Sequence, residues 1–93
     1  MASERSGDHL HQALAAATEG AAAEQRGQGR VADRKFAFAL RLLTDRNAAG
    51  KLSEVCTMYA EILRARGDDD RGFSLMRMAA ERDFTKLRTF LRK

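Results

Sequence analysis

Three groups of residues in this sequence have side chains capable of chemistry: one cysteine, two histidines and a run of three aspartates. Cys56 has no histidine near it in the sequence, so it lacks the base of a cysteine hydrolase. It also falls on the apolar side of a predicted helix, where a small packed hydrophobe is expected rather than a reactive thiol. His9 and His11 have no third or fourth zinc ligand at a suitable spacing. We therefore predict that both histidines are surface residues.

The aspartates at 68–70 invite interpretation as a magnesium site. Consecutive residues at a helix start point in different directions, however, whereas the ligands of a metal ion converge. Because a glycine precedes the run and an apolar periodic stretch follows it, the aspartates predict a helix N-terminus instead. The GQG sequence at 27–29 follows no strand, so it predicts a hinge and not a phosphate-binding loop. From these residues we expect no enzyme activity, no metal site and no cofactor.

Length and composition limit the fold class. A chain of 93 residues makes one domain at most, and its 44% hydrophobic content with only 6% aromatic residues and no proline favours helix throughout. No alternating run of β-branched residues predicts a strand. A single cysteine excludes an internal disulfide, no apolar run reaches the length of a membrane span, and the first residues lack the apolar core of a secretion signal. The expectation is an all-α cytoplasmic protein.

The segment with the broadest apolar face is a helix predicted over 51–66, with the sequence KLSEVCTMYAEILRAR. At about 100° per residue, its apolar side chains cover an arc of about 200°. An amphipathic surface helix needs an apolar stripe of only about 100°. This segment is therefore expected to contact neighbours on two sides, as the central helix of a small bundle.

Two further helices complete the predicted bundle. One runs over about 30–46 and ends at the short turn 47–50, which makes its neighbour antiparallel. The other is predicted over about 69–92, because its apolar residues keep one helical phase: Phe73, Met76, Ala80, Phe84, Leu87 and Leu91. A break near Asp83 is the alternative, since this residue could cap a separate short helix. The sequence thus predicts an antiparallel three-helix bundle of about residues 30–93.

Residues 1–29 differ from the rest of the chain. After Met1, Leu10 and Leu14 are the only large apolar residues in the segment, which otherwise consists mainly of alanine, glycine and polar residues. Such a helix would have a thin apolar edge and would be marginal alone. We expect a mobile or weakly helical N-terminal segment over 1–29, followed by the bundle domain.

The helix predicted over 30–46 has apolar residues on two opposite sides. Ala32, Phe36, Ala39, Leu40 and Leu43 share the stripe assigned to the core. The second stripe is surrounded by charged residues and is typical of a contact surface. We therefore expect a small non-enzymatic adaptor, inhibitor or chaperone-like regulator that binds another protein, or itself as a homodimer. The residues predicted to bind this partner are Val31, Phe38, Leu42, Leu75 and Met78.

A nucleic-acid-binding regulator, also dimeric, is the alternative. The chain has 17 Lys and Arg against 13 Asp and Glu, a net charge of +4. A predicted helix–turn–helix, a basic arm and free stacking aromatics are all missing from the pattern, which favours a solvated basic surface. If the chain does bind nucleic acid, the residues expected to contact phosphate are Arg77, Lys86, Arg88, Arg92 and Lys93.

Overall fold

The computed structural model describes residues 2–46 and 48–92, with side chains described over 9–46, at 48 and over 50–91. This part of the chain forms five helices and no strand, which confirms the all-α prediction. The helices are α1 (Ala2–Gln25), α2 (Gly29–Asp45), α3 (Ala49–Ala65), α4 (Asp69–Ala80) and α5 (Phe84–Arg92).

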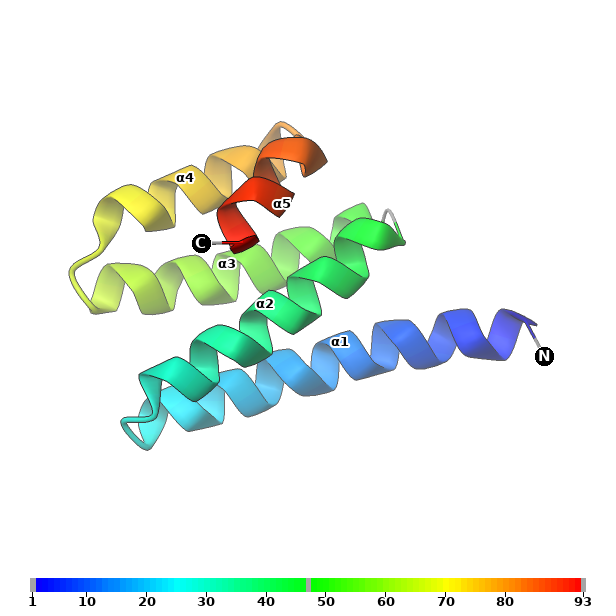
Figure 1. Ribbon diagram of the computed structural model, residues 1–93, viewed down its shortest axis with the longest axis horizontal. Coiled ribbons are helices and arrows are strands. Elements are labelled where there is room, and N and C mark those ends of the chain that lie inside the picture. Colours follow the sequence, from blue (N-terminus) through cyan, green and yellow to red (C-terminus); the bar gives the residue numbers. More distant parts are fainter. Residues whose placement is uncertain (1, 47, 93) are drawn as a thin grey trace.

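The helices pack in chain order. Figure 1 shows α1 along α2, α3 beside α2, and α4 returning antiparallel to α3. The short helix α5 then crosses back and packs on α4 and α2. The predicted three-helix bundle is therefore wrong, because α1 packs along α2 as a further helix of the globule and α5 is a separate element.

Helix α1 packs against α2 mainly through small side chains, while its two leucines, Leu10 and Leu14, are partly buried against the core. Its buried face consists of glycine and alanines, namely Ala13, Ala16, Ala17, Gly20 and Ala23. A Cβ atom built on Gly20 would lie 2.9 Å from two ring carbons of Phe36, so the missing side chain makes room for that ring. An alanine face lets two helix axes approach closely, and the larger side chains of α2 fill the interface. A search for large apolar residues could not find this face.

The centre of the core follows the predicted stripes of α2 and α3. Phe36, Leu40 and Leu43 of α2 are completely buried, as are Val55 and Leu63 of α3. Phe36 and Tyr59 stack across the two helices, with ring centroids 4.8 Å apart and an interplanar angle of 9°. The broad apolar arc of α3 is occupied as predicted, because this helix contacts α1, α2 and α4.

Capping residues set the start of α4. Gly67 adopts a φ of +92°, which favours glycine, and ends the preceding helix. The side chain of Asp68 accepts a hydrogen bond from the backbone N–H of Arg71 at 3.3 Å. Asp69 and Asp70 occupy the first turn, where carboxylates interact favourably with the helix dipole. The prediction that this acidic run starts a helix is confirmed.

The predicted single helix over 69–92 is wrong, and the alternative of a break near Asp83 is confirmed. Arg82 has a φ of 55°, and the Asp83 side chain accepts a hydrogen bond from the N–H of Lys86 at 3.1 Å. The break lets α4 and α5 bury independent faces.

As a result, the predicted phase of α4 is also wrong. The buried face of α4 contains Gly72, Leu75 and Met78, whereas Phe73 is 54% and Met76 is 40% exposed. Gly72 explains this choice, because a Cβ atom there would lie 3.1 Å from the carbonyl oxygen of Ala60 on α3. Only a face with glycine at this position fits so close to α3.

The contact between α1 and α2 yields a stability prediction. In Gly20→Ala the added methyl group meets a completely buried ring, and we expect this overpacking to cost about 1–3 kcal/mol. Alanine brings a gain of about 1 kcal/mol to a helix interior, so the free energy of unfolding should fall by up to about 2 kcal/mol. Urea unfolding followed by circular dichroism measures the difference.

Gly50→Ala is the matched control, because no atom lies within 4 Å of a Cβ built there. This variant should be as stable as the original protein or slightly more stable. Equal effects of the two substitutions would show that the contact between Gly20 and Phe36 does not limit the packing.

Candidate functional site

The predicted second stripe of α2 lies largely on the surface. Val31 is 38% and Phe38 is 48% exposed, while Leu42 is half-buried against the core. Phe36 and Phe38 are two positions apart and therefore point to opposite sides of the helix. The same helix thus supplies one phenylalanine to the core and another to solvent.

Phe38 borders a shallow groove between α1 and α2. Its volume is about 540 Å³, and it is lined by Gln12, Ala15, Ala16, Glu19, Arg34, Lys35 and Phe38. The groove exists because α1 presents alanines next to the large ring of α2, so the surface is lower on the α1 side.

Among the described residues, some of the charged side chains around the groove form ion pairs with a neighbouring helix, and one of them does not. Nζ of Lys35 on α2 lies 3.1 Å from Oε1 of Glu19 on α1, and this ion pair joins the two helices. Arg34 also lines the groove, but it forms no ion pair with the residues that the structure describes. The groove therefore combines an apolar anchor, a neutralised pair and a free positive charge.

Two of the predicted partner-binding residues lie elsewhere. Leu75 is completely buried and Met78 is 9% exposed, both on the face of α4 that packs into the globule. The structure therefore corrects the prediction that Leu75 and Met78 belong to an exposed partner-binding surface. The sequence pattern places Phe73 and Met76 in the apolar phase of the segment 69–92 instead.

The predicted phosphate-contacting residues are divided between two helices. Arg77 is exposed on α4, whereas Lys86 and Arg88 belong to α5. Lys86 lies 3.7 Å from Asp83, and Arg88 lies 3.2 Å from Asp45 of α2. The Arg92 side chain and the whole of Lys93 lie outside the described part. Two of the three described cations are thus paired with a carboxylate.

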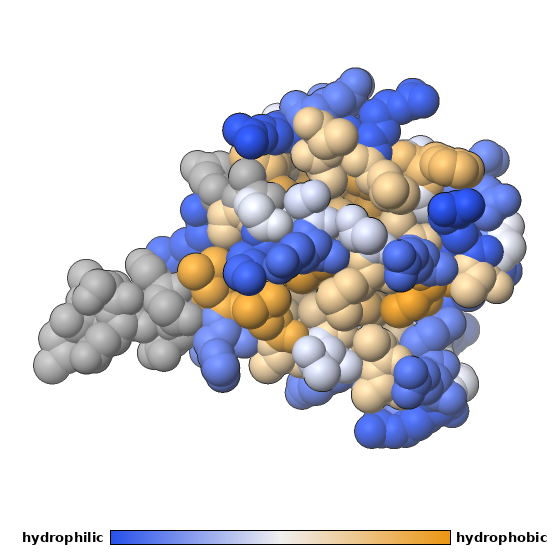
Figure 2. Space-filling model, turned by 180° about the vertical axis from the view of Figure 1, so that it is seen from behind, coloured by the Kyte–Doolittle hydropathy of each residue, from blue (hydrophilic) through white to orange (hydrophobic). Residues whose placement is uncertain are grey.

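A second exposed apolar area involves residues that the sequence assigned to the core. The guanidinium carbon of Arg64 lies 4.9 Å from the centre of the exposed Phe73 ring, within cation–π range. Figure 2 shows the molecule from behind, where apolar side chains cross the middle of the face and are interrupted by polar ones. Arg64 covers one side of this ring, yet Phe73 is slightly more exposed than Phe38, at 54% against 48%. Phe73 differs from Phe38 in that it does not line the groove.

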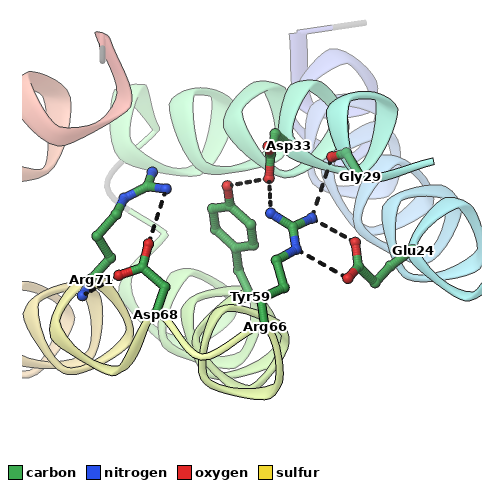
Figure 3. Close-up of polar contacts among 7 residues, drawn as sticks. All are labelled: Glu24, Gly29, Asp33, Tyr59, Arg66, Asp68 and Arg71. Atoms are coloured by element: carbon green, nitrogen blue, oxygen red, sulfur yellow. Dashed lines mark hydrogen bonds and ion pairs between the residues drawn. The ribbon is translucent and has the colours of Figure 1, made fainter. Parts of the chain in front are cut away.

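A polar network that the sequence did not predict joins three helices. Arg66, at the C-terminus of α3, donates from Nε to Glu24 of α1 at 3.0 Å and from Nη1 to Asp33 of α2 at 2.9 Å (Figure 3). Arg66 also donates to the carbonyl oxygen of Gly29 at 3.3 Å, and the hydroxyl of Tyr59 donates to Asp33 at 2.8 Å. These partners are far apart in sequence, so no local pattern reveals them.

The same contacts shift the pKa values of the network. The hydrogen bonds from Arg66 lower the pKa of Glu24 below its usual value of 4.5. Burial, together with the hydrogen bond to Asp33, raises the pKa of Tyr59 to about 12. The Arg66 guanidinium, held mainly by Glu24, has a raised pKa and stays charged. This arrangement stabilises the ion pair between Arg66 and Glu24.

A small cavity of about 160 Å³ lies beside this network, lined by Asp33, Ala37, Tyr59, Arg71, Phe90 and Leu91. Its charged groups already have partners. Asp33 accepts from Arg66 and Tyr59, while Arg71 lies 3.6 Å from Asp68 and 5.0 Å from the centre of the Phe90 ring. The cavity is therefore part of the structural network.

Among the described residues, no group of three or more His, Cys, Asp or Glu could hold a metal ion. Cys56 is completely buried, and burial raises the pKa of its thiol to about 12. Within the same residues, no helix has the length and apolar character needed to cross a membrane.

The chain matches no protein-family model, and neither the curated proteins nor the solved structures contain a significant match to it. Function must therefore be inferred from the surface itself.

The Arg66 network predicts a pH dependence of stability. Because the pKa of Glu24 is lower in the folded than in the unfolded state, its contribution is complete above the usual pKa of 4.5 and is lost as pH falls through the folded pKa. We expect Glu24→Gln to lower the free energy of unfolding by about 1 kcal/mol at neutral pH and by less in acid. Urea unfolding at several pH values measures this.

Glu54→Gln provides the control, because within the described part of the chain Glu54 forms only an exposed pair with Lys51 on its own helix. Its stability curve should follow that of the original protein at every pH. If Glu24→Gln also follows that curve, Arg66 does not hold α1 through this carboxylate.

Burial of Cys56 predicts slow thiol chemistry. With a pKa of about 12, only about one thiol in ten thousand is ionised at pH 8, and the sulfur has no access to solvent. We expect a disulfide reagent to label the folded protein only as fast as the protein opens, and to label it immediately in urea. Rapid labelling of the folded protein would place the thiol at an accessible site.

Proposed function

We propose that this protein is a small non-enzymatic interaction module that binds a partner protein through the groove between α1 and α2. Phe38 is the principal anchor, and Val31 and Leu42 extend the contact along α2. The observation that carries this proposal is the 48% exposure of Phe38 beside a groove of about 540 Å³.

Physical reasons support a protein partner. Aromatic residues in the centre of a contact contribute most to protein–protein affinity, and a polar rim excludes water from them. Phe38 has this setting, since the apolar floor of Ala15 and Ala16 lies beside it and charged residues surround it. An adaptor, an inhibitor or a chaperone-like regulator would use such a surface in the same physical way.

Two other functions remain as alternatives. A homodimer would use the same groove, with a second copy of Phe38 as the anchor. A nucleic-acid-binding regulator would use the basic residues of α4 and α5, and its affinity would fall steeply with salt. The pairing of Lys86 and Arg88 with carboxylates favours the protein partner over nucleic acid.

The test is affinity capture with the tagged protein from a native lysate after nuclease treatment. We expect a defined protein that survives moderate salt and is lost with Phe38→Asp. Truncating an aromatic anchor of this kind costs about 2 kcal/mol or more of binding free energy. The variant should remain folded, with stability within about 0.5 kcal/mol of the original, because the ring is on the surface.

Phe73→Asp is the matched control, since Phe73 is a phenylalanine of similar, slightly greater exposure outside the groove. It should retain the captured protein. Equal loss in the two variants, or unfolding caused by Phe38→Asp, would contradict the proposal. Loss of all partners on nuclease treatment would instead favour nucleic acid.

A further inference from the structure

The charges beside the groove indicate which kind of protein segment fits it, if the groove binds a protein as proposed above. We infer that the partner presents an amphipathic helix whose apolar side is flanked by acidic residues. The helix would lie over α2 with an apolar side chain against Phe38.

Two parallel stripes on α2 carry this inference. The apolar stripe contains the exposed Val31 and Phe38, and the basic stripe contains the exposed Arg30, Arg34 and Arg41. Arg34 and Arg41 lie four residues before and three residues after Phe38, so each is its neighbour on the helix surface. The basic stripe extends along about 16 Å of the helix.

The basic stripe carries uncompensated charge. Within the described part of the chain, its three arginines form no ion pair, whereas Lys35, Arg66 and Arg88 each have a carboxylate partner. The nearby acidic residues are already engaged, because Glu19 pairs with Lys35 and Asp45 pairs with Arg88. Carboxylates from outside would therefore meet free guanidinium groups, which bind them with two parallel hydrogen bonds.

The shape of the groove favours a helix as the occupant. Its lining residues extend over two turns of α1, from Gln12 to Glu19, and over more than one turn of α2, from Arg34 to Phe38. A third helix packs naturally in the depression between two others, with anchors at i, i+3 or i+4, and i+7. The alanines on the α1 side allow its backbone to come close.

A second copy of this chain fits less well. In a two-fold dimer centred on this surface with the two α2 helices antiparallel, the basic stripes of the two copies would meet, and like charges across an interface are unfavourable. With the two helices parallel, neither basic stripe would gain a carboxylate from the basic or apolar stripe of the other copy. Nucleic acid would satisfy the basic stripe, but it would leave the apolar stripe without a specific role. An acidic amphipathic helix would supply carboxylates to the basic stripe and apolar side chains to the apolar stripe.

The experiment is a selection from a phage-displayed library of random peptides of about 16 residues, long enough to span α2. The original protein should enrich peptides with net negative charge and apolar residues at helical spacing. Phe38→Asp should enrich none of them. Arg34→Glu/Arg41→Glu should bind the selected peptides at least about tenfold more weakly at low salt, because opposite charges become like charges.

Arg77→Glu/Arg82→Glu is the control, because it changes the net charge equally at exposed positions outside the groove. It should bind the selected peptides like the original protein. Enrichment of neutral or basic peptides, or unchanged binding by Arg34→Glu/Arg41→Glu, would overturn the inference. Failure to enrich any peptide that depends on Phe38 would overturn it as well.

Three further outcomes identify a different occupant. If the lysate capture depends on Phe38 while the library yields neutral or basic peptides, the groove binds proteins but the acidic class is wrong. A dimer that is detected by sedimentation equilibrium and lost with Phe38→Asp would assign the groove to self-association. Binding of a labelled mixed-sequence DNA that is lost with Arg34→Glu/Arg41→Glu but not with Phe38→Asp would assign the basic stripe to phosphate.

Discussion

The ring of Phe36 is the contact on which the rest of the structure depends. It lies against Gly20 of α1 on one side and stacks on Tyr59 of α3, so a single side chain of α2 joins three helices. The phenol of Tyr59 continues this connection, because its hydroxyl donates to Asp33, which also accepts from Arg66. Arg66 in turn binds Glu24 of α1. An apolar contact and a polar network thus hold the same three helices, and each fixes the geometry that the other needs.

This packing also produces the groove. Helix α1 can lie close to α2 only where its side chains are small, and the alanines that allow this approach continue onto its outer side. The inner side of α2 fills the core with Phe36, while the outer side carries Phe38 above the lower surface of α1. Because α1 carries small side chains and α2 carries large ones where they meet, a depression remains beside the exposed ring of Phe38. Such a depression requires no additional loop or insertion.

The sequence predicted the parts of the fold that depend on large apolar residues at helical spacing. The helices near 30–46 and 51–66, the core stripe with Phe36 and Leu40, and the exposure of Phe38 all follow from this pattern. The sequence prediction failed where the lack of a side chain at a glycine determines how two helices pack. Gly20 and Gly72 contribute no hydrophobicity, yet they determine how α1 docks and which face of α4 is buried. The sequence pattern could not predict the Arg66 network either, because its partners come together only after the helices have packed.

The separation of core and groove on α2 also affects how a partner could bind. The only ion pair described across the groove joins Lys35 and Glu19, and both side chains are about half exposed. Such a pair contributes little stability, of the order of 0–1 kcal/mol. An acidic residue of a partner could therefore replace Glu19 as the neighbour of Lys35 at small cost, while the Arg66 network still holds α1 to α3. Charge pairing in the groove can change without disturbing the fold, because the contacts that define the fold lie on the opposite side of the same helix.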